Sequence, residues 1–311
     1  MDRNLALEFV RVTEAAAIAA AKWIGKGEGK KADGAAVDEM RDRFNQINFK
    51  GKVVIGEGAK DEAPELYTGE IVGKGKGPVM DLAIDPLECT DSVAFGRYNA
   101  ITVITAGAPK SLMSAPDAYM EKIAAGPKAA KVIRLDAPVK VNIERTAKAL
   151  GKKKSDITVC ILDRERHEDL IKEVRQAGAR VRLITDGDVA GGIAPSMPDT
   201  GIDLLMGIGS STEAVLAAAA IKILGGEIQA RFKPINETSE KVIKKAGMSL
   251  NRIYRTEDLA KGKQLTFTAT GVIDGPLLSG VRITDNAIIT HSIVMRGMSG
   301  TIRYITTHHH K

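Results

Sequence analysis

The sequence is poor in aromatic residues, which make up 4% of its 311 positions and include a single tryptophan. Proteins that bind single-stranded nucleic acid stack bases on aromatic side chains, so this scarcity argues against that class. The formal charge of +6 is compatible with an anionic partner. The lysines and arginines are scattered rather than grouped in blocks. We therefore expect no nucleic-acid partner, and keep a basic nucleic-acid-binding protein as the alternative from another functional class.

Cysteine is also scarce, with only Cys89 and Cys160. Two cysteines give no disulfide framework, which indicates a reducing compartment. Cys160 lies in an apolar run and is expected to be a core thiol. No apolar run reaches the roughly 18 residues of a membrane span, and the first residues do not have the form of a signal peptide. We expect a cytoplasmic protein with no membrane partner.

The sequence shows no serine–histidine or cysteine–histidine pairing typical of a nucleophile. His167 and His291 are isolated, so a surface or core position is expected for each rather than metal ligation. The run His308–His310 is either native or a remnant of a tag, and the sequence leaves this open.

The hydrophobic pattern changes near residue 155, which predicts two lobes, residues 1–150 and 151–311. In the first, helices are expected at 3–24 and from Asp33 to about 47, and strands at 52–55, 79–85 and 100–105. This order indicates an α+β lobe. In the second, a strand at 157–162, a helix at 165–177, strands at 180–184 and 202–206, an Ala-rich helix to 224 and a strand at 288–295 are expected. The strand–helix–strand order predicts parallel strands and an α/β lobe that binds ligands at its C-terminal strand ends.

The stretch from Asp81 to Thr90 carries the clearest chemical signal. Pro86 cannot donate to a sheet ladder, so the strand is expected to stop at Asp85. Asp85 and Glu88 would then end a tight turn and direct both carboxylates to one point, just before a helix start. Carboxylates suit hard cations and a helix N-terminus suits phosphate, which together indicate metal-assisted phosphoryl chemistry. A turn followed by a capped helix is the structural alternative.

Other acidic residues also lie where predicted elements begin or end. Asp33 precedes a helix and is alternatively an N-cap. Glu57 lies between two glycines after a strand, and Asp61 follows it. Glu213 begins the Ala-rich helix, where Ser210-x-x-Glu213 forms a capping box that needs no metal.

These residues lie in motifs that resemble the class II, GlpX-type fructose-1,6-bisphosphatases, within the lithium-sensitive sugar and inositol phosphatase superfamily. The similarity runs over nearly the whole chain. It is carried by Ala32-Asp-Gly-Ala-Ala36, Val54-Ile-Gly-Glu-Gly58, Asp61-Glu-Ala-Pro64, Asp85-Pro-Leu-Glu88, Ala115-Pro-Asp-Ala-Tyr-Met120, Asp186-Gly-Asp-Val189 and Gly207-Ile-Gly209.

The resemblance implies a layered αβαβα sandwich and a site that uses Mn²⁺ or Mg²⁺. It implies the metal ligands Asp33, Glu57, Asp85, Glu88 and Glu213. It implies that Asp61 and Thr90 orient or deprotonate the attacking water. It implies that the sugar and its second phosphate contact Glu88, Cys89, Thr90, Tyr119, Arg164, Glu165, Arg166, Asp186, Gly187, Asp188 and Ser210. It also implies homo-oligomers, either dimers or tetramers.

Three positions depart from the family pattern. Cys89 replaces the glycine of the superfamily signature, and a side chain there is costly if the backbone needs a positive φ. Ala59 stands where many relatives have Glu. Gly29 occupies the position of a loop lysine, so Lys30 and Lys31 receive no role.

The expected function is hydrolysis of the 1-phosphate of fructose 1,6-bisphosphate, a step of gluconeogenesis, by a water activated by a divalent metal. Three alternatives remain open at this point. One is a dual enzyme that also accepts sedoheptulose 1,7-bisphosphate. Another is an impaired form that binds the sugar without turnover because of Cys89. An inositol phosphatase fits less well, because the pair Arg164 and Arg166 suits a second phosphate.

Overall fold

The chain divides into two compact units, and the computed structural model describes residues 5–58 and 65–310. Unit 1 combines Met1–Ser114 with Gly262–Lys311, and unit 2 is Ala115–Lys261. This division differs from the expected boundary at residue 150. The difference arises because β5 pairs within the second sheet, while the C-terminal strands return to the first.

Unit 1 is built on a mixed eight-stranded sheet with the order β12-β13-β11-β4-β3-β1-β2, in which β14 also pairs with β13. Its strands are β1 (Lys50–Ile55), β2 (Ile71–Val72), β3 (Val79–Glu88), β4 (Ala100–Gly107), β11 (Leu265–Ile273), β12 (Arg282–Ile283), β13 (Ala287–Arg296) and β14 (Thr301–His310). Only β1 and β3 pair in parallel, and the other pairs are antiparallel.

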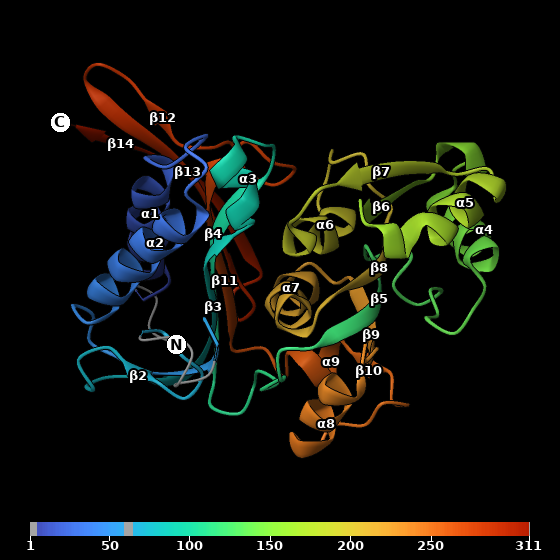
Figure 1. Cartoon of the computed structure of the whole chain (residues 1–311), viewed down its shortest axis with the longest axis horizontal. Coiled ribbons are helices and arrows are strands. Elements are labelled where there is room, and N and C mark those ends of the chain that lie inside the picture. Colours follow the sequence, from blue (N-terminus) through green and yellow to red (C-terminus); the bar gives the residue numbers. More distant parts are fainter. Residues whose placement is uncertain (1–4, 59–64, 311) are drawn as a thin grey trace. The chain divides into compact units, whose positions relative to one another are not determined.

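Two amphipathic helices, α1 (Leu5–Ala21) and α2 (Gly29–Phe44), pack on this sheet (Figure 1). Their apolar faces meet around Phe9, Phe44 and Phe49, whose ring centroids lie 5.5 to 5.9 Å apart. Edge-to-face aromatic packing of this kind contributes beyond simple area burial. The helix α3 (Thr90–Phe95) follows β3 directly.

The strand β3 continues past the residue at which it was expected to stop. It runs to Glu88, and its register with β4 shifts between Asp85 and Glu88. Three steps along β3 match two along β4, so an extra residue bulges at this point. At a bulge one residue makes no ladder hydrogen bond, so Pro86, which has no N–H, fits there. The strand therefore continues, and the predicted stop at Asp85 was wrong.

Unit 2 is built on a six-stranded sheet with the order β10-β9-β5-β8-β6-β7. Its strands are β5 (Tyr119–Ala125), β6 (Thr158–Leu162), β7 (Arg180–Ile184), β8 (Leu204–Ser210), β9 (Glu227–Phe232) and β10 (Tyr254–Arg255). Its helices are α4 (Val139–Leu150), α5 (Glu168–Gln176), α6 (Asp188–Ile193), α7 (Ser211–Ile223), α8 (Glu237–Lys245) and α9 (Thr256–Leu259), with short 3₁₀ turns at Lys154–Asp156, Glu165–His167 and Ala194–Ser196.

Helices cover both faces of the unit 2 sheet (Figure 1). One face packs Ile143 of α4 and Val174 of α5 against Val159 of β6. On the other face, Gly191 of α6 lies against Cys160 of β6 and Leu205 of β8. Cys160 follows Val159 in the strand and so points to the opposite face. Strand residues alternate between faces, so a strand covered on both sides, such as β6, is mostly apolar.

These layers confirm the expected α/β class. Parallel pairing of β6 with β7 confirms the predicted strand–helix–strand unit. Cys160 is buried and free, as expected for a core thiol. No helix within residues 5–58 and 65–310 is both long and apolar enough to span a bilayer.

Candidate active site

Three of the expected metal ligands lie close together in unit 1. Asp33 is on α2, Glu57 follows the end of β1, and Asp85 sits at the bulge of β3. Asp33 is inside the helix, whose N-cap is Glu28, so the alternative reading of Asp33 as an N-cap is wrong. This placement leaves the Asp33 carboxylate without a capping task.

The electrostatics of these carboxylates show how close they are. Desolvation, followed by repulsion from Asp85 and Asp33, raises the pKa of Glu57 to about 9. Desolvation and the charge of Asp33 raise the pKa of Asp85 to about 7, against a backbone hydrogen bond from Leu87 that lowers it. Burial also raises the pKa of Asp33. Like charges held together out of water disfavour the ionised form, so a counter-cation would stabilise this arrangement.

The donor set fits a hard divalent cation, because it consists of carboxylate oxygens. Glu88 extends the set along the same strand and is buried. No group of three or more His, Cys, Asp or Glu side chains within the described ranges is already arranged as a metal site. The charges of Asp33, Glu57 and Asp85 nevertheless act on one another, as the raised pKa of Glu57 indicates. Asp61 and Ala59 lie outside the described residues.

Cys89 occupies the left-handed region of backbone space, with φ 77° and ψ 51°. Glycine adopts this conformation without steric cost, which explains why a glycine suits the position. The next residue, Thr90, begins α3, and its hydroxyl donates to the Leu87 carbonyl over 3.1 Å. With its proton committed there, the Thr90 oxygen keeps acceptor capacity, which is compatible with orienting a water.

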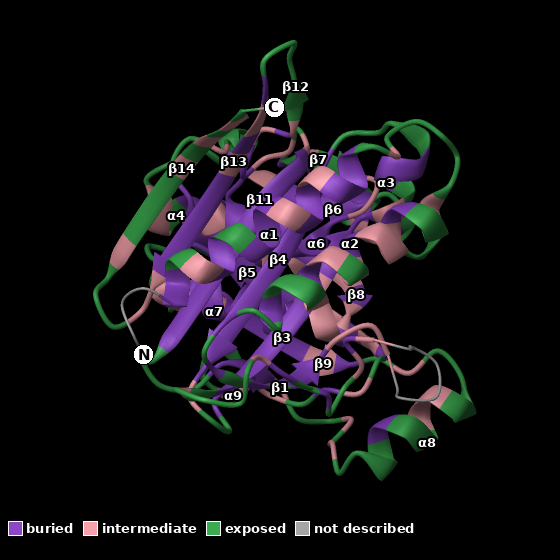
Figure 2. Cartoon of the chain, turned by 90° about the vertical axis from the view of Figure 1, so that its left-hand side faces the viewer, coloured by how far each residue is buried: buried purple, intermediate pink, exposed green. Residues whose placement is uncertain are grey.

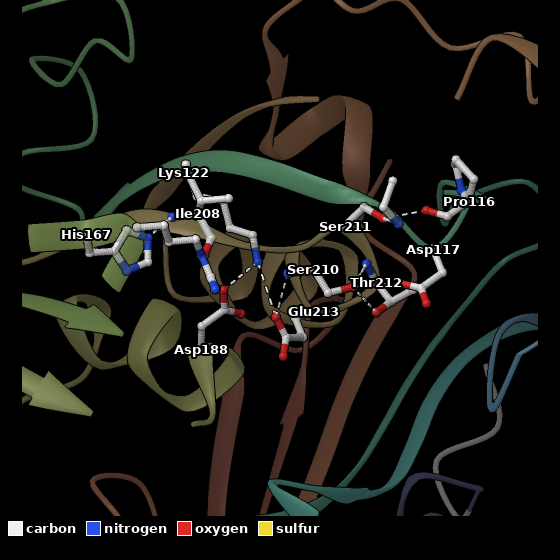
Figure 3. Close-up of polar contacts among 12 residues, drawn as sticks. Pro116, Asp117, Lys122, His167, Asp188, Ile208, Ser210, Ser211, Thr212 and Glu213 are labelled. Atoms are coloured by element: carbon white, nitrogen blue, oxygen red, sulfur yellow. Dashed lines mark hydrogen bonds and ion pairs between the residues drawn. The ribbon is translucent and has the colours of Figure 1, made fainter. Parts of the chain in front are cut away.

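A buried charged network holds the expected site residues of unit 2 (Figure 3). The Lys122 ammonium on β5 lies 2.6 Å from Asp188 Oδ2 and 3.5 Å from Glu213 Oε2. Desolvation and the charge of Asp188 raise the pKa of Glu213, while Lys122 lowers it. Lys122 was not predicted, since it lies beside Glu121 in β5 and resembles an exposed charge in the sequence.

His167 links the end of β6 to β8 beside this network (Figure 3). Its Nδ1 lies 2.8 Å from the Leu162 carbonyl, and its Nε2 accepts the Ile208 N–H over 2.7 Å. Both bonds form together only in the neutral ring with the proton on Nδ1. Burial lowers the pKa of His167, and its core position confirms the prediction made from its isolation.

The expected phosphate-gripping residues lie at the C-terminal ends of the unit 2 strands. Arg164 Nη2 lies 2.6 Å from Asp186 Oδ1. Arg166 donates to the Ile208 carbonyl and stacks over the Tyr119 ring, with 5.1 Å between guanidinium carbon and ring centroid. The structure therefore brings both arginines to one edge of the sheet, where they were expected.

Glycine and serine shape the backbone beside these groups. Gly187 has φ 87° and caps α6, so Asp188 begins that helix. Ser210 caps α7, where its Oγ accepts the Thr212 N–H and the Glu213 carboxylate accepts the Ser210 N–H. The predicted capping box is confirmed, so Glu213 has a structural task besides any ligand role. Glu165 lies exposed in the turn after β6.

A cavity of about 230 Å³ lies beside the His167 support. Its lining includes Lys122, Arg166, His167 and Gly207. A side chain at Gly207 would meet His167 Nε2 at 3.1 Å, so glycine keeps this wall open.

Comparisons with known proteins agree with these features. The profile of the family described as "Bacterial fructose-1,6-bisphosphatase, glpX-encoded" matches residues 3–309. The chain is 44% identical to the fructose-1,6-bisphosphatase class 2 of Haemophilus influenzae, over 100% of this chain and 97% of that protein. It is 41% identical to a Synechococcus protein named D-fructose 1,6-bisphosphatase class 2/sedoheptulose 1,7-bisphosphatase, with the same coverage of 100% and 97%.

A solved chain described as an extragenic suppressor from Pyrococcus furiosus has a TM-score of 0.30 and 10% identity, covering 60% of this chain and 68% of its own. A likeness this weak supports no argument about either fold or site.

Proposed function

Because the chain belongs to the glpX-type class 2 fructose-1,6-bisphosphatase family of phosphatases, we propose that it hydrolyses the 1-phosphate of fructose 1,6-bisphosphate. Water attacks phosphorus, the bond from phosphorus to the C1 oxygen breaks, and the products are fructose 6-phosphate and phosphate. The observation that carries the proposal is the trio Asp33, Glu57 and Asp85, in which burial and the neighbouring charges raise the pKa of Glu57 and Asp85, so that a bound cation would stabilise the ionised carboxylates.

We propose that this trio and Glu88 hold Mn²⁺ or Mg²⁺. The family resemblance also gives Glu213, in unit 2, the role of a metal ligand. When bound, such a cation neutralises phosphoryl oxygens and lowers the pKa of water. The Thr90 oxygen is available to orient the attacking water, a role that the family pattern also gives to Asp61. Arg164 and Arg166 suit the distal phosphate, because guanidinium forks bind phosphate oxygens bidentately. Tyr119 supports this by holding the Arg166 plane.

The Asp85→Asn variant tests the metal site with two measurements. In wild type, Mn²⁺ is expected to raise the melting temperature and to support phosphate release, and chelator is expected to abolish both effects. In Asp85→Asn, the thermal shift should disappear and phosphate release should fall by at least about 100-fold. The matched control Asp38→Asn, on the exposed side of α2, should behave as wild type. A normal Mn²⁺ shift in Asp85→Asn would contradict the proposed ligand set.

Sedoheptulose 1,7-bisphosphate is a second candidate substrate, supported by the dual name of the Synechococcus relative. Comparison of kcat/KM for the two bisphosphates in one Mn²⁺ buffer distinguishes a dual enzyme from a fructose-specific one.

Cys89 replaces the signature glycine, so a form that binds the sugar without turnover is an alternative. Comparison of phosphate release by wild type and Cys89→Gly distinguishes the two. Turnover in both proteins would make the cysteine a tolerated variation. Turnover only in Cys89→Gly would make this chain an impaired form. Absence of phosphate release from both folded, metal-loaded proteins would refute the proposed substrate.

We also propose a cytoplasmic homo-oligomer, either a dimer or a tetramer. The free, buried cysteines support a reducing compartment. The edge strand β14 supports self-association: it is exposed beside the buried β13 (Figure 2), and displays Ile302 and Tyr304. Light scattering after size-exclusion chromatography tests this, and a monomer at micromolar concentration would contradict it.

A further inference from the structure

A basic hollow lies on unit 2, away from the strand ends that carry Arg164 and Arg166. Its volume is about 730 Å³, and it is lined by Lys131, Val132, Arg134, Arg145, Lys148 and Ala149. Cavities that hold small molecules commonly have about this volume. We propose that this hollow binds a small phosphorylated anion, at a site separate from that of the bisphosphate substrate.

The charge of the hollow is uncompensated. In the part of the chain that the structure describes, no carboxylate forms an ion pair with Lys131, Arg134, Arg145 or Lys148. Two acidic residues near them in sequence are already committed elsewhere. Asp136 lies 2.6 Å from Arg231, and Glu144 lies 3.2 Å from Lys154. The cations therefore keep their full attraction for an anion from solution.

The wall that carries Lys131 and Arg134 is held rigid by buried side chains. The Asn142 amide accepts the Arg134 N–H over 2.9 Å and donates to the carbonyls of Arg134 and Ala137. Gln229 donates to the Ile133 carbonyl and accepts the Leu135 N–H. Both amide side chains have a relative exposure of 0%. Because the backbone of this wall is already fixed, only the side chains of Lys131 and Arg134 need to be ordered when a ligand binds.

The opposite wall is the last part of α4. Arg145 and Lys148 are three residues apart and so share one face of that helix. Arg134 uses its Nη1 to bind the carbonyls of Lys131 and Ile133, which leaves other guanidinium N–H groups available. Two arginine forks and two ammonium groups suit phosphate oxygens. Val132 and Ala149 add apolar contact for the organic part of such a ligand.

Binding of inorganic pyrophosphate to the full-length, metal-free protein tests the proposal by isothermal titration calorimetry at low salt. The double variant Arg145→Gln/Lys148→Gln is expected to bind about tenfold more weakly or worse, because two charge-assisted contacts are lost. The matched control Lys241→Gln/Lys245→Gln removes the same charge from the exposed surface of α8 and should bind as wild type. Arg166→Gln should also keep this binding, which separates the hollow from the proposed substrate site.

A cation in the last turn of a helix also favours the helix itself, so melting temperature alone does not decide the matter. If the double variant fails to fold, Lys131→Gln on the other wall replaces it, with a loss of binding again expected. Equal weakening in the α8 control would show only general charge attraction and overturn the proposal. Loss in Arg166→Gln alone would place all binding at the substrate site and overturn it. Tighter binding of a single-stranded oligonucleotide at the same residues would assign the hollow to nucleic acid instead.

Discussion

The left-handed backbone at Cys89 makes a prediction about the stability of unit 1. A residue with a Cβ pays roughly 1–2 kcal/mol in this conformation, and glycine does not. Glycine in turn gives the unfolded chain more freedom, which offsets about 0.4–1 kcal/mol of that gain. Cys89 is buried, with 9% relative exposure, so its sulfur contributes packing. Cys89→Gly and Cys89→Ala both remove that sulfur and lose its packing equally. The two variants then differ only in the Cβ methyl group and in the backbone strain that it causes, and Cys89→Gly should be more stable by up to about 1 kcal/mol.

The single tryptophan provides the assay. Trp23 packs against the same core cluster as Cys89, so its fluorescence during urea unfolding reports on unit 1. The expected difference corresponds to about 2–4 °C in melting temperature for a unit of this size. If Cys89→Ala proved as stable as Cys89→Gly, the backbone at this position would not be strained, and the reasoning would be refuted.

Two further predictions concern unit 2 and are read by far-UV circular dichroism. Lys122→Met leaves Asp188 buried without its partner and should lower the free energy of unfolding by about 3–5 kcal/mol. The double variant Lys122→Met/Asp188→Asn should recover part of this loss. No recovery would count against the ion pair as the cause. Folding lowers the pKa of His167 below its ordinary value of 6.5, so the unfolded chain binds the proton more readily and stability should fall as the pH drops below about 6.5. His167→Gln should be less stable at neutral pH but should show a weaker dependence on pH in that range, and an unchanged slope would contradict the assignment.

The sequence predicted the elements in which local pattern and tertiary packing agree. The helix predicted over residues 3–24 is α1 (Leu5–Ala21), and the predicted parallel pair is β6 and β7. The end of β3 was missed because a bulge, which depends on pairing with β4, relieves Pro86. The sequence shows that Pro86 lacks a backbone N–H, but it does not show how the partner strand β4 pairs around the bulge.

The candidate site shows the same limit. The cluster of Asp33, Glu57 and Asp85 was anticipated from acidic residues near the ends of elements and from the family pattern, and the structure brings them together. Lys122 was not anticipated, because its partners Asp188 and Glu213 are 66 or more residues away and meet it only through strand pairing. The predicted lobe boundary at residue 150 placed the C-terminal strands in the second lobe. In the structure β11 pairs with β4, which places them in unit 1.

The pairing of β4 with β11 also has a consequence for synthesis on the ribosome. Gly107 lies opposite Leu265, so the chain leaves the first sheet and returns to it at neighbouring points, with the whole of unit 2 between them. Unit 2 is contiguous and is translated before β11, β12, β13 and β14, so it has all its strands while the first sheet still lacks those four. Domains generally fold as units during translation. During this interval α1 lacks the strands β11 and β13 that it packs against, so its apolar face stays exposed until they are synthesised.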